Sequence, residues 1–279
     1  MTILVTGASG HVGRAVLNQL RAAGVGVRAS SRDPQAAHLP TGVPVVAADL
    51  TRPETLPVAL DGVSRVFLYA QPEGIDGFVR AATAAGVEHV VLLSSSSTVT
   101  GPGASDPIAQ RHLVVEQALE NSGMAWTFVR PGAFATNALR WADAIRAEGV
   151  VRMPYPRAQT APIHEADIAA VAVAALTGSA LHGAAPVLTG PDALTQEEQV
   201  VQIGAALGRD LRVEELTPDQ ARAAMAGSMP PSFVNTMLRM WAALEGVPAM
   251  ISDSVERITG HRARSFAQWA CDHEADFRA

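Results

Sequence analysis

Short apolar runs alternate with amphipathic segments over the first two-thirds of the chain. Six runs are rich in Val and Leu without strict alternation, which is typical of strands buried on both faces of a parallel sheet: Ile3–Val5, Val25–Ala29, Val43–Ala47, Arg65–Tyr69, His89–Leu93 and Trp126–Arg130. Four segments between them carry apolar residues at helical spacing: Val12–Ala23, Glu54–Leu60, Ile75–Ala85 and Pro107–Asn121. This order predicts parallel βαβ units and an α/β fold with a doubly wound parallel sheet.

The later part of the chain is less regular. Its pattern predicts a strand at Val150–Met153, a helix at His164–Leu176 and a final strand at Ala184–Leu188. Helical patterns then dominate, from Thr195–Leu207 to Ser265–Asp276. We expect this part to form a smaller, mostly helical subdomain.

A glycine-rich segment, T-G-A-S-G-H-V-G, joins the first predicted strand to the first predicted helix. Gly7 permits a tight turn, Gly10 lets the backbone approach a pyrophosphate, and Gly13 lets helix and strand pack closely. The free N–H groups at the start of the helix point toward phosphate. The segment predicts a Rossmann domain that binds NAD(P), and the alternative is a glycine turn without a ligand. The candidate cofactor-binding residues are Gly7, Ser9, Gly10, His11, Val12 and Gly13.

The end of the second strand indicates which dinucleotide is bound. NAD-specific sites commonly place Asp or Glu there, on the ribose hydroxyls. Here two serines precede Arg32, which suits a 2′-phosphate through charge-assisted hydrogen bonds. Asp33 falls one step late and is expected to cap the following turn. The segment predicts that NADP(H) is preferred over NAD(H), the alternative being that Arg32 is a solvated surface residue.

Composition excludes several classes of function. All 21 basic residues are arginine, so every mechanism that needs a lysine is excluded. The net charge of −6 argues against a nucleic-acid partner. The chain has no apolar stretch of membrane-spanning length and no export signal, and its single Cys271 suits a reducing compartment, so we expect a cytoplasmic protein. The histidines are scattered and no metal is predicted.

These motifs, in this order, resemble the NmrA-like atypical short-chain dehydrogenases/reductases over most of the chain. Among that family the sequence is similar to type 2 quinone oxidoreductases and triphenylmethane reductases. The resemblance implies NAD(P) at the glycine turn and Arg32, with Asp49 and Leu50 beside the adenine. Ala70 and Gln71 are further cofactor-binding candidates by their position after the fourth strand. Thr127–Gly132 resembles the family's sixth strand and the loop after it, and this resemblance adds Pro131 to the candidates.

The catalytic position departs from the Tyr-dependent branch of the superfamily, which carries Tyr and Lys four residues apart. Ile108 and His112 stand at those places in this sequence. The resemblance implies that His112 contacts the nicotinamide ribose, and it does not imply proton donation to a ketone. Its own chemistry leaves two alternatives open: a proton donor with a pKa near neutrality, or a surface residue of the helix.

The other candidates lie at the substrate side. Ser94 or Ser95, at the end of the fifth strand, could hydrogen-bond a substrate oxygen, or the serine run is only a polar strand exit. Ser94 is accordingly both a catalytic and a cofactor-binding candidate. Tyr155 and Phe134 are candidate substrate-lining residues.

The favoured function is an NADPH-dependent reductase that passes hydride to an apolar conjugated acceptor such as a quinone, an enone or a dye. Such an acceptor delocalises the negative charge, so the missing tyrosine costs little. The alternative is an NADP(H)-binding sensor of the NmrA type without catalysis. We expect residues 1–189 to form the NAD(P)-binding domain, with 134–165 contributing to the substrate side, and 190–279 to form the substrate-side subdomain. The partner is a small apolar molecule, with neither nucleic acid nor membrane, and monomer or homodimer stays open.

Overall fold

The computed structural model describes residues 1–100, 106–227 and 229–278. Contacts among the described residues group them into two compact units. Unit 1 comprises the described residues of 1–132, 165–188 and 254–261. Unit 2 comprises the described residues of 133–164, 189–253 and 262–279. The division of function between 1–189 and 190–279 stays a prediction.

Unit 1 is built on a seven-stranded sheet in the order β3-β2-β1-β4-β5-β6-β9, and every pairing in it is parallel. The strand order reverses between β1 and β4, and ligands of doubly wound sheets bind outside the carboxyl ends of the strands at such a point. The sheet confirms the predicted α/β class. Its strands are β1 (Thr2–Val5), β2 (Gly26–Ser31), β3 (Val45–Ala47), β4 (Arg65–Tyr69), β5 (His89–Leu93), β6 (Ala125–Pro131) and β9 (Val187–Leu188).

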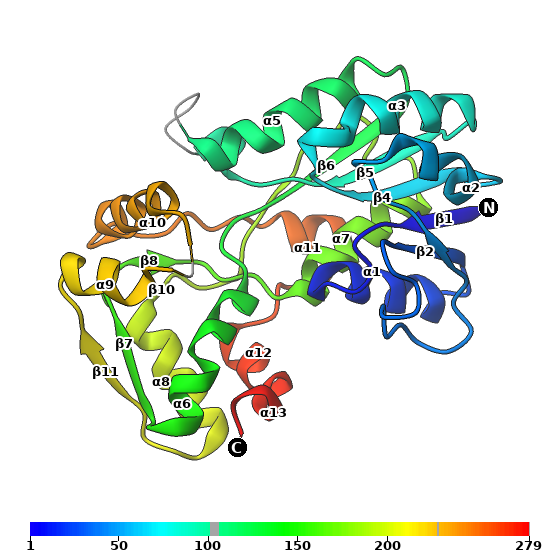
Figure 1. Ribbon diagram of the computed structural model, residues 1–279. Helices are drawn as coiled ribbons and strands as arrows, with labels where there is room; N and C mark the ends of the chain where they lie inside the picture. The colour runs from blue at the N-terminus through cyan, green and yellow to red at the C-terminus, as the bar shows by residue number, and fades with distance from the viewer. Residues whose placement is uncertain (101–105, 228, 279) are drawn as a thin grey trace. The chain divides into compact units, whose positions relative to one another are not determined.

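Helices cover both faces of this sheet, because successive strand residues point to opposite faces and both sets are apolar (Figure 1). α2, α3 and α5 pack on one face, where Leu4, Val66 and Phe128 lie in a cluster with their apolar residues. α1 and α7 pack together against the other face, and α11 packs on α7. The helices are α1 (His11–Ala22), η1 (Pro53–Thr55), α2 (Leu56–Leu60), η2 (Pro72–Gly74), α3 (Ile75–Ala84), α4 (Ser97–Thr100), α5 (Pro107–Glu120), α7 (Glu165–Thr177) and α11 (Ser254–Thr259).

Unit 2 is mostly helical, as predicted, around two two-stranded pairings. A core cluster joins Trp141, Ile145 and Val151 to the apolar faces of α8 and α12, and a second cluster surrounds Trp241. Its elements are η4 (Ala135–Trp141), α6 (Ala142–Ala147), β7 (Val150–Met153), β8 (Gln159–Thr160), β10 (Leu194–Thr195), α8 (Gln196–Leu207), β11 (Arg212–Glu215), α9 (Pro218–Met225), α10 (Pro231–Leu244), α12 (Phe266–Asp272) and α13 (Glu274–Phe277).

The strand predicted at Val150–Met153 is confirmed as β7, which pairs with β11 in unit 2. Two other predicted elements differ from the structure. The strand predicted at Ala184–Leu188 is shorter, because only Val187 and Leu188 pair as a strand with β6 while Ala184 makes an isolated bridge. The helix predicted at Ser265–Asp276 is interrupted at His273, whose Nδ1 lies 2.7 Å from Oδ2 of Asp276.

Candidate functional site

The glycine turn between β1 and α1 has the geometry that its spacing predicts. Gly7 has φ +61°, a conformation that side-chain-bearing residues rarely adopt. A Cβ at Gly13 would lie 2.2 Å from the carbonyl oxygen of Gly7, so helix and turn can pack only without a side chain there. Two of the three glycines are therefore required by the fold itself.

Neither a positive φ nor a steric clash requires a glycine at position 10. Its φ of −78° is open to any residue, and a Cβ there would meet only the Gly7 carbonyl oxygen at 3.4 Å. Ser9, Gly10 and His11 are exposed, and no side chain caps the start of α1. The first N–H groups of a helix have no partner within the helix, and together with the dipole they form an anion site. The turn therefore has the open backbone and the free N–H groups that a pyrophosphate site needs.

After β2, Arg32 is exposed to solvent, whereas Asp33 forms hydrogen bonds with the backbone of the following turn. Oδ1 of Asp33 accepts hydrogen bonds from the backbone N–H groups of Gln35 (3.1 Å) and Ala36 (3.3 Å). The predicted cap is therefore confirmed, and that carboxylate oxygen serves the turn. Arg32 is exposed, and the described residues offer its guanidinium no hydrogen bond or ion pair.

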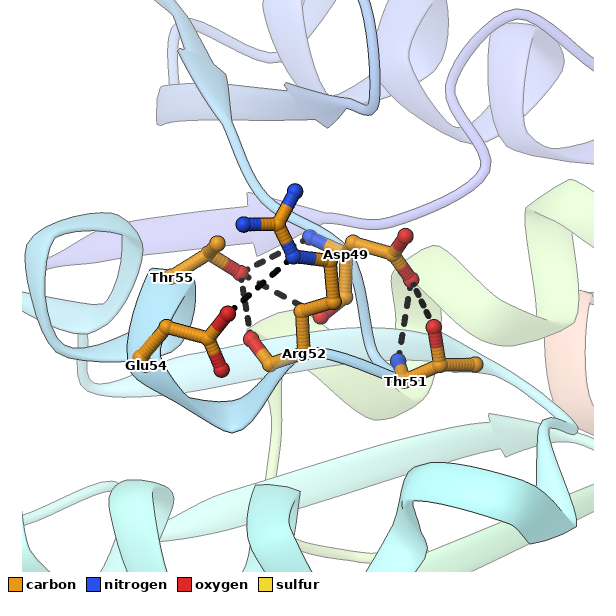
Figure 2. Close-up of polar contacts among 5 residues, drawn as sticks. All are labelled: Asp49, Thr51, Arg52, Glu54 and Thr55. Atoms are coloured by element: carbon orange, nitrogen blue, oxygen red, sulfur yellow. Dashed lines mark hydrogen bonds and ion pairs between the residues drawn. The ribbon is translucent and has the colours of Figure 1, made fainter.

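Asp49 is fixed in a tight loop after β3 (Figure 2). Its Oδ1 accepts hydrogen bonds from the backbone N–H (2.9 Å) and the hydroxyl (2.8 Å) of Thr51, and its own N–H donates to Oγ1 of Thr55 at 3.0 Å. The Thr51 hydrogen bonds lower the pKa of Asp49, and the charge of Arg32 lowers it further. The second carboxylate oxygen takes no hydrogen bond from the residues drawn in Figure 2. Asp49 thus offers a negative acceptor close to Arg32.

The neighbouring Leu50 is buried, and the backbone of Gly74 packs closely against its carbonyl group. A Cβ at Gly74, which precedes α3, would lie 1.8 Å from the Leu50 carbonyl oxygen. Only glycine lets these two segments approach so closely. Sequence reasoning missed this role of Gly74, because nothing local to position 74 indicates which backbone lies against it.

The carboxyl ends of β5 and β6 share a buried network with α5. Glu116 accepts two hydrogen bonds from Arg130, Nε to Oε1 at 2.9 Å and Nη2 to Oε2 at 2.7 Å. Ser94 donates its hydroxyl to the same Oε1 at 2.5 Å. The side chains of Arg130 and Glu116 are 16% and 3% exposed, and Ser94 is buried. Ser94 could be singled out from the sequence, whereas the roles of Glu116 and Arg130 could not, and the Ser94 hydroxyl donates to the Glu116 carboxylate.

His112 lies on α5, one turn before Glu116, and is half-buried. Its Nδ1 is a buried polar atom without a hydrogen-bond partner among the described residues. Burial lowers the pKa of His112 below 6.5, and the nearby Glu116 carboxylate opposes that shift. The side chain is therefore mainly a neutral imidazole at pH 7, with its Nδ1 enclosed by protein.

The remaining unit 1 candidates line the same strand ends. Gln71 donates its amide to Oε2 of Glu73 at 2.8 Å, and Ala70 beside it is half-buried. The carbonyl of Pro131 accepts the N–H of Ser96 at 2.9 Å, which ties β6 to the serine run.

The two substrate-lining candidates belong to unit 2. Tyr155 has φ +52°, a strained conformation for a residue with a side chain. Phe134 is half-buried and bridges to Ile163. Among the described residues, no group of three His, Cys, Asp or Glu side chains could hold a metal ion. Within the same residues, no helix combines the length and the apolar character needed to cross a bilayer.

Comparison with known proteins agrees with this geometry. Residues 7–179 match a family model described as NAD(P)H-binding. The chain is 42% identical over 281 residues to a (4-alkanoyl-5-oxo-2,5-dihydrofuran-3-yl)methyl phosphate reductase of Streptomyces griseus, and 38% identical over 288 residues to an NAD(P)H azoreductase of Xenophilus azovorans. Each alignment covers 99% of both proteins.

A solved structure extends the likeness to the fold. An NADPH-dependent quinone oxidoreductase from Escherichia coli superposes with a TM-score of 0.80 at 25% identity, over 98% of this chain and 99% of that one. The chain therefore belongs to the NAD(P)H-binding family of NmrA-like, atypical short-chain dehydrogenases/reductases, and it is an NAD(P)H-dependent oxidoreductase.

Proposed function

We propose that this oxidoreductase uses NADPH to reduce the conjugated double bond of a small acceptor. The observation that carries the proposal is the pairing of an uncapped, exposed helix start at the glycine turn with an unpaired arginine at the end of β2. The first suits a pyrophosphate and the second suits a 2′-phosphate. When bound, the reduced nicotinamide supplies a hydride, and the acceptor takes up a proton to complete a two-electron reduction.

The preference for NADPH rests on the end of β2. An NAD-specific site needs a free carboxylate for the ribose hydroxyls. One oxygen of Asp33, the acid nearest that position, is held by the backbone of Gln35 and Ala36. Arg32 offers a planar fork of donors that matches a phosphate. The exposed guanidinium favours the phosphorylated cofactor.

The proposed class of acceptor is based on the missing Tyr–Lys pair and on the names of the relatives. With no lysine and only Tyr69 and Tyr155, the chain has no Tyr–Lys pair to protonate an alkoxide. A conjugated acceptor spreads the incoming negative charge over several atoms and needs no strong acid beside it. The relatives reduce a dihydrofuranone phosphate and azo compounds by name, and both are conjugated acceptors.

We assign His112 a positioning role. Nδ1 of His112 is enclosed by protein, so Nε2 is the ring nitrogen left to face a ligand. Through Nε2, the neutral imidazole forms a hydrogen bond with a ribose hydroxyl and so fixes the cofactor. Ser94, Glu116 and Arg130 lock the ends of β5, β6 and α5 together, so Ser94 supports the site through Glu116 and does not act on the substrate.

A sensor without catalysis has weaker support. It would bind NADPH tightly and turn over no acceptor, whereas the relatives that align over 99% of both chains are reductases by name.

The test is to offer purified protein NADPH with an uncharged 1,4-quinone, an azo dye and an aliphatic ketone, and to follow cofactor absorbance. We expect turnover of the quinone and the dye and little turnover of the ketone. One NADPH should be consumed for every two electrons that the acceptor gains. Tight NADPH binding without turnover of any acceptor would contradict the reductase.

A further inference from the structure

Unit 2 contains an arginine in an unusual setting. Arg140, in η4, places its guanidinium carbon 4.7 Å from the ring centroid of Trp141 and 5.4 Å from that of Trp241. Both tryptophans are at least 94% buried, one in each of the two apolar clusters of this unit. Arginine suits such a place because its delocalised charge is weakly hydrated and stacks on aromatic faces.

No acidic side chain among the described residues pairs with the charge of Arg140. Its one hydrogen bond to the described residues runs from Nη2 to the neutral amide oxygen of Gln196, at 2.8 Å. Arg152, another arginine of unit 2, is balanced by two acids, Glu148 and Glu214. Surrounding protein lowers the pKa of Arg140 to about 10, so it stays charged at pH 7, and it nevertheless remains exposed to solvent. An unpaired cation that is partly desolvated and still accessible attracts an anion more strongly than a fully hydrated one.

The partner amide is itself held in one orientation. Nε2 of Gln196 donates to the carbonyl oxygens of Pro154 (3.2 Å) and Tyr155 (3.0 Å), so its oxygen is directed to Arg140. One hydrogen bond and two aromatic rings therefore orient the guanidinium, and its remaining N–H groups make no hydrogen bond to the described residues. Gln196 also links Arg140 to Tyr155, whose φ of +52° marks a strained backbone at a candidate substrate residue.

We propose that Arg140, oriented by Gln196, Trp141 and Trp241, is an anion site of unit 2 that binds a phosphate monoester group carried by the acceptor. A guanidinium fork donates two parallel hydrogen bonds to such a group, and no carboxylate of the described residues competes for it. The proposal rests on the proposed reductase function and narrows its substrate class, from conjugated acceptors in general to those with a phosphate substituent. It also gives unit 2 a recognition role that is separate from cofactor binding in unit 1.

The test uses hexyl phosphate as the probe and hexan-1-ol as its uncharged counterpart, with the protein saturated with NADP⁺. Calorimetric titration should give saturable one-to-one binding of hexyl phosphate and none of hexan-1-ol. Arg140→Gln should weaken that binding about ten- to a hundredfold, the loss expected for a charge-assisted pair. Arg140→Lys, which keeps the charge but loses the fork, should fall between the two.

Arg212→Gln is the matched control, because Arg212 is an exposed arginine of β11 that makes no ion pair with the described residues. It should bind hexyl phosphate as the wild type does. NADPH affinity should be equal in all four proteins, which shows that each is folded. Equal weakening in the Arg212 variant, or binding that disappears when NADP⁺ is present, would overturn the proposal. The titration needs no turnover, so the two proposals can fail separately. Hexyl phosphate can fail to bind while the protein reduces the quinone, and it can bind while the protein reduces no acceptor.

Discussion

Replacing Glu116 with glutamine tests whether the buried network at the ends of β5 and β6 holds unit 1 together. The substitution keeps the shape of the side chain and removes its charge, which leaves the Arg130 guanidinium, 16% exposed, without a counterion. Removing one partner of a buried ion pair costs about 3–5 kcal/mol. For a protein of this size that loss lowers Tm by roughly 6–20 °C. Thermal unfolding followed by circular dichroism measures it.

The same helix provides the control. Arg111 on α5 makes a bidentate ion pair with Glu73 in which both side chains are more than half exposed. Because exposed pairs contribute at most about 1 kcal/mol, Arg111→Gln should shift Tm by only a few degrees.

A double variant separates the ion pair from general damage to the site. Glu116→Leu combined with Arg130→Met removes both charges, so it should be less destabilised than Glu116→Gln alone. The single variants Glu116→Leu and Arg130→Met are measured beside it. If the double variant loses as much stability as the two single variants together, or if Glu116→Gln costs no more than Arg111→Gln, the buried network does not stabilise the fold.

Three further predictions concern the cofactor contacts and acid stability. Arg32→Ala should weaken NADPH binding about ten- to a hundredfold and leave NADH binding unchanged, measured by cofactor fluorescence; equal losses for both would make Arg32 structural. Since burial lowers the pKa of His112, kcat/KM should be level above pH 6.5 and fall in acid as the ring protonates, whereas a fall as pH rises through neutrality would identify a general acid. His89 is fully buried, with its pKa lowered to about 4, so the folded state disfavours its protonation. Stability should therefore decrease as pH falls from 6.5 toward 4, by up to about 3 kcal/mol; a His89→Leu variant that lost as much stability over that window would show that another group is responsible.

The fold could be predicted because it is encoded locally. Each strand of the main sheet is a continuous apolar run, and Gly24, Gly86 and Gly123, which follow α1, α3 and α5, all adopt the left-handed conformation that ends a helix. The glycine turn was recognisable because its spacing, strand and helix are contiguous in the sequence.

Features that depend on distant segments could not be read in this way. Val150–Met153 has the composition of a main-sheet strand, yet it pairs with β11, which lies some sixty residues further on. Glu116 and Arg130 stand on a helix and the following strand, and no local pattern shows that one is directed at the other. The setting of Arg140 likewise needs Gln196 and Trp241, which follow it by 56 and about a hundred residues.

Transfer of the hydride itself is the central claim. The most direct measurement uses NADPH deuterated at C4 of the nicotinamide, on each face in turn, with an enone as acceptor and mass spectrometry of the product. We expect one deuterium to enter a carbon of the reduced acceptor from one of the two labelled cofactors only, because a fixed cofactor presents a single face. A reduced product without deuterium from either cofactor, or the absence of any reduced product while NADPH remains tightly bound, would contradict it.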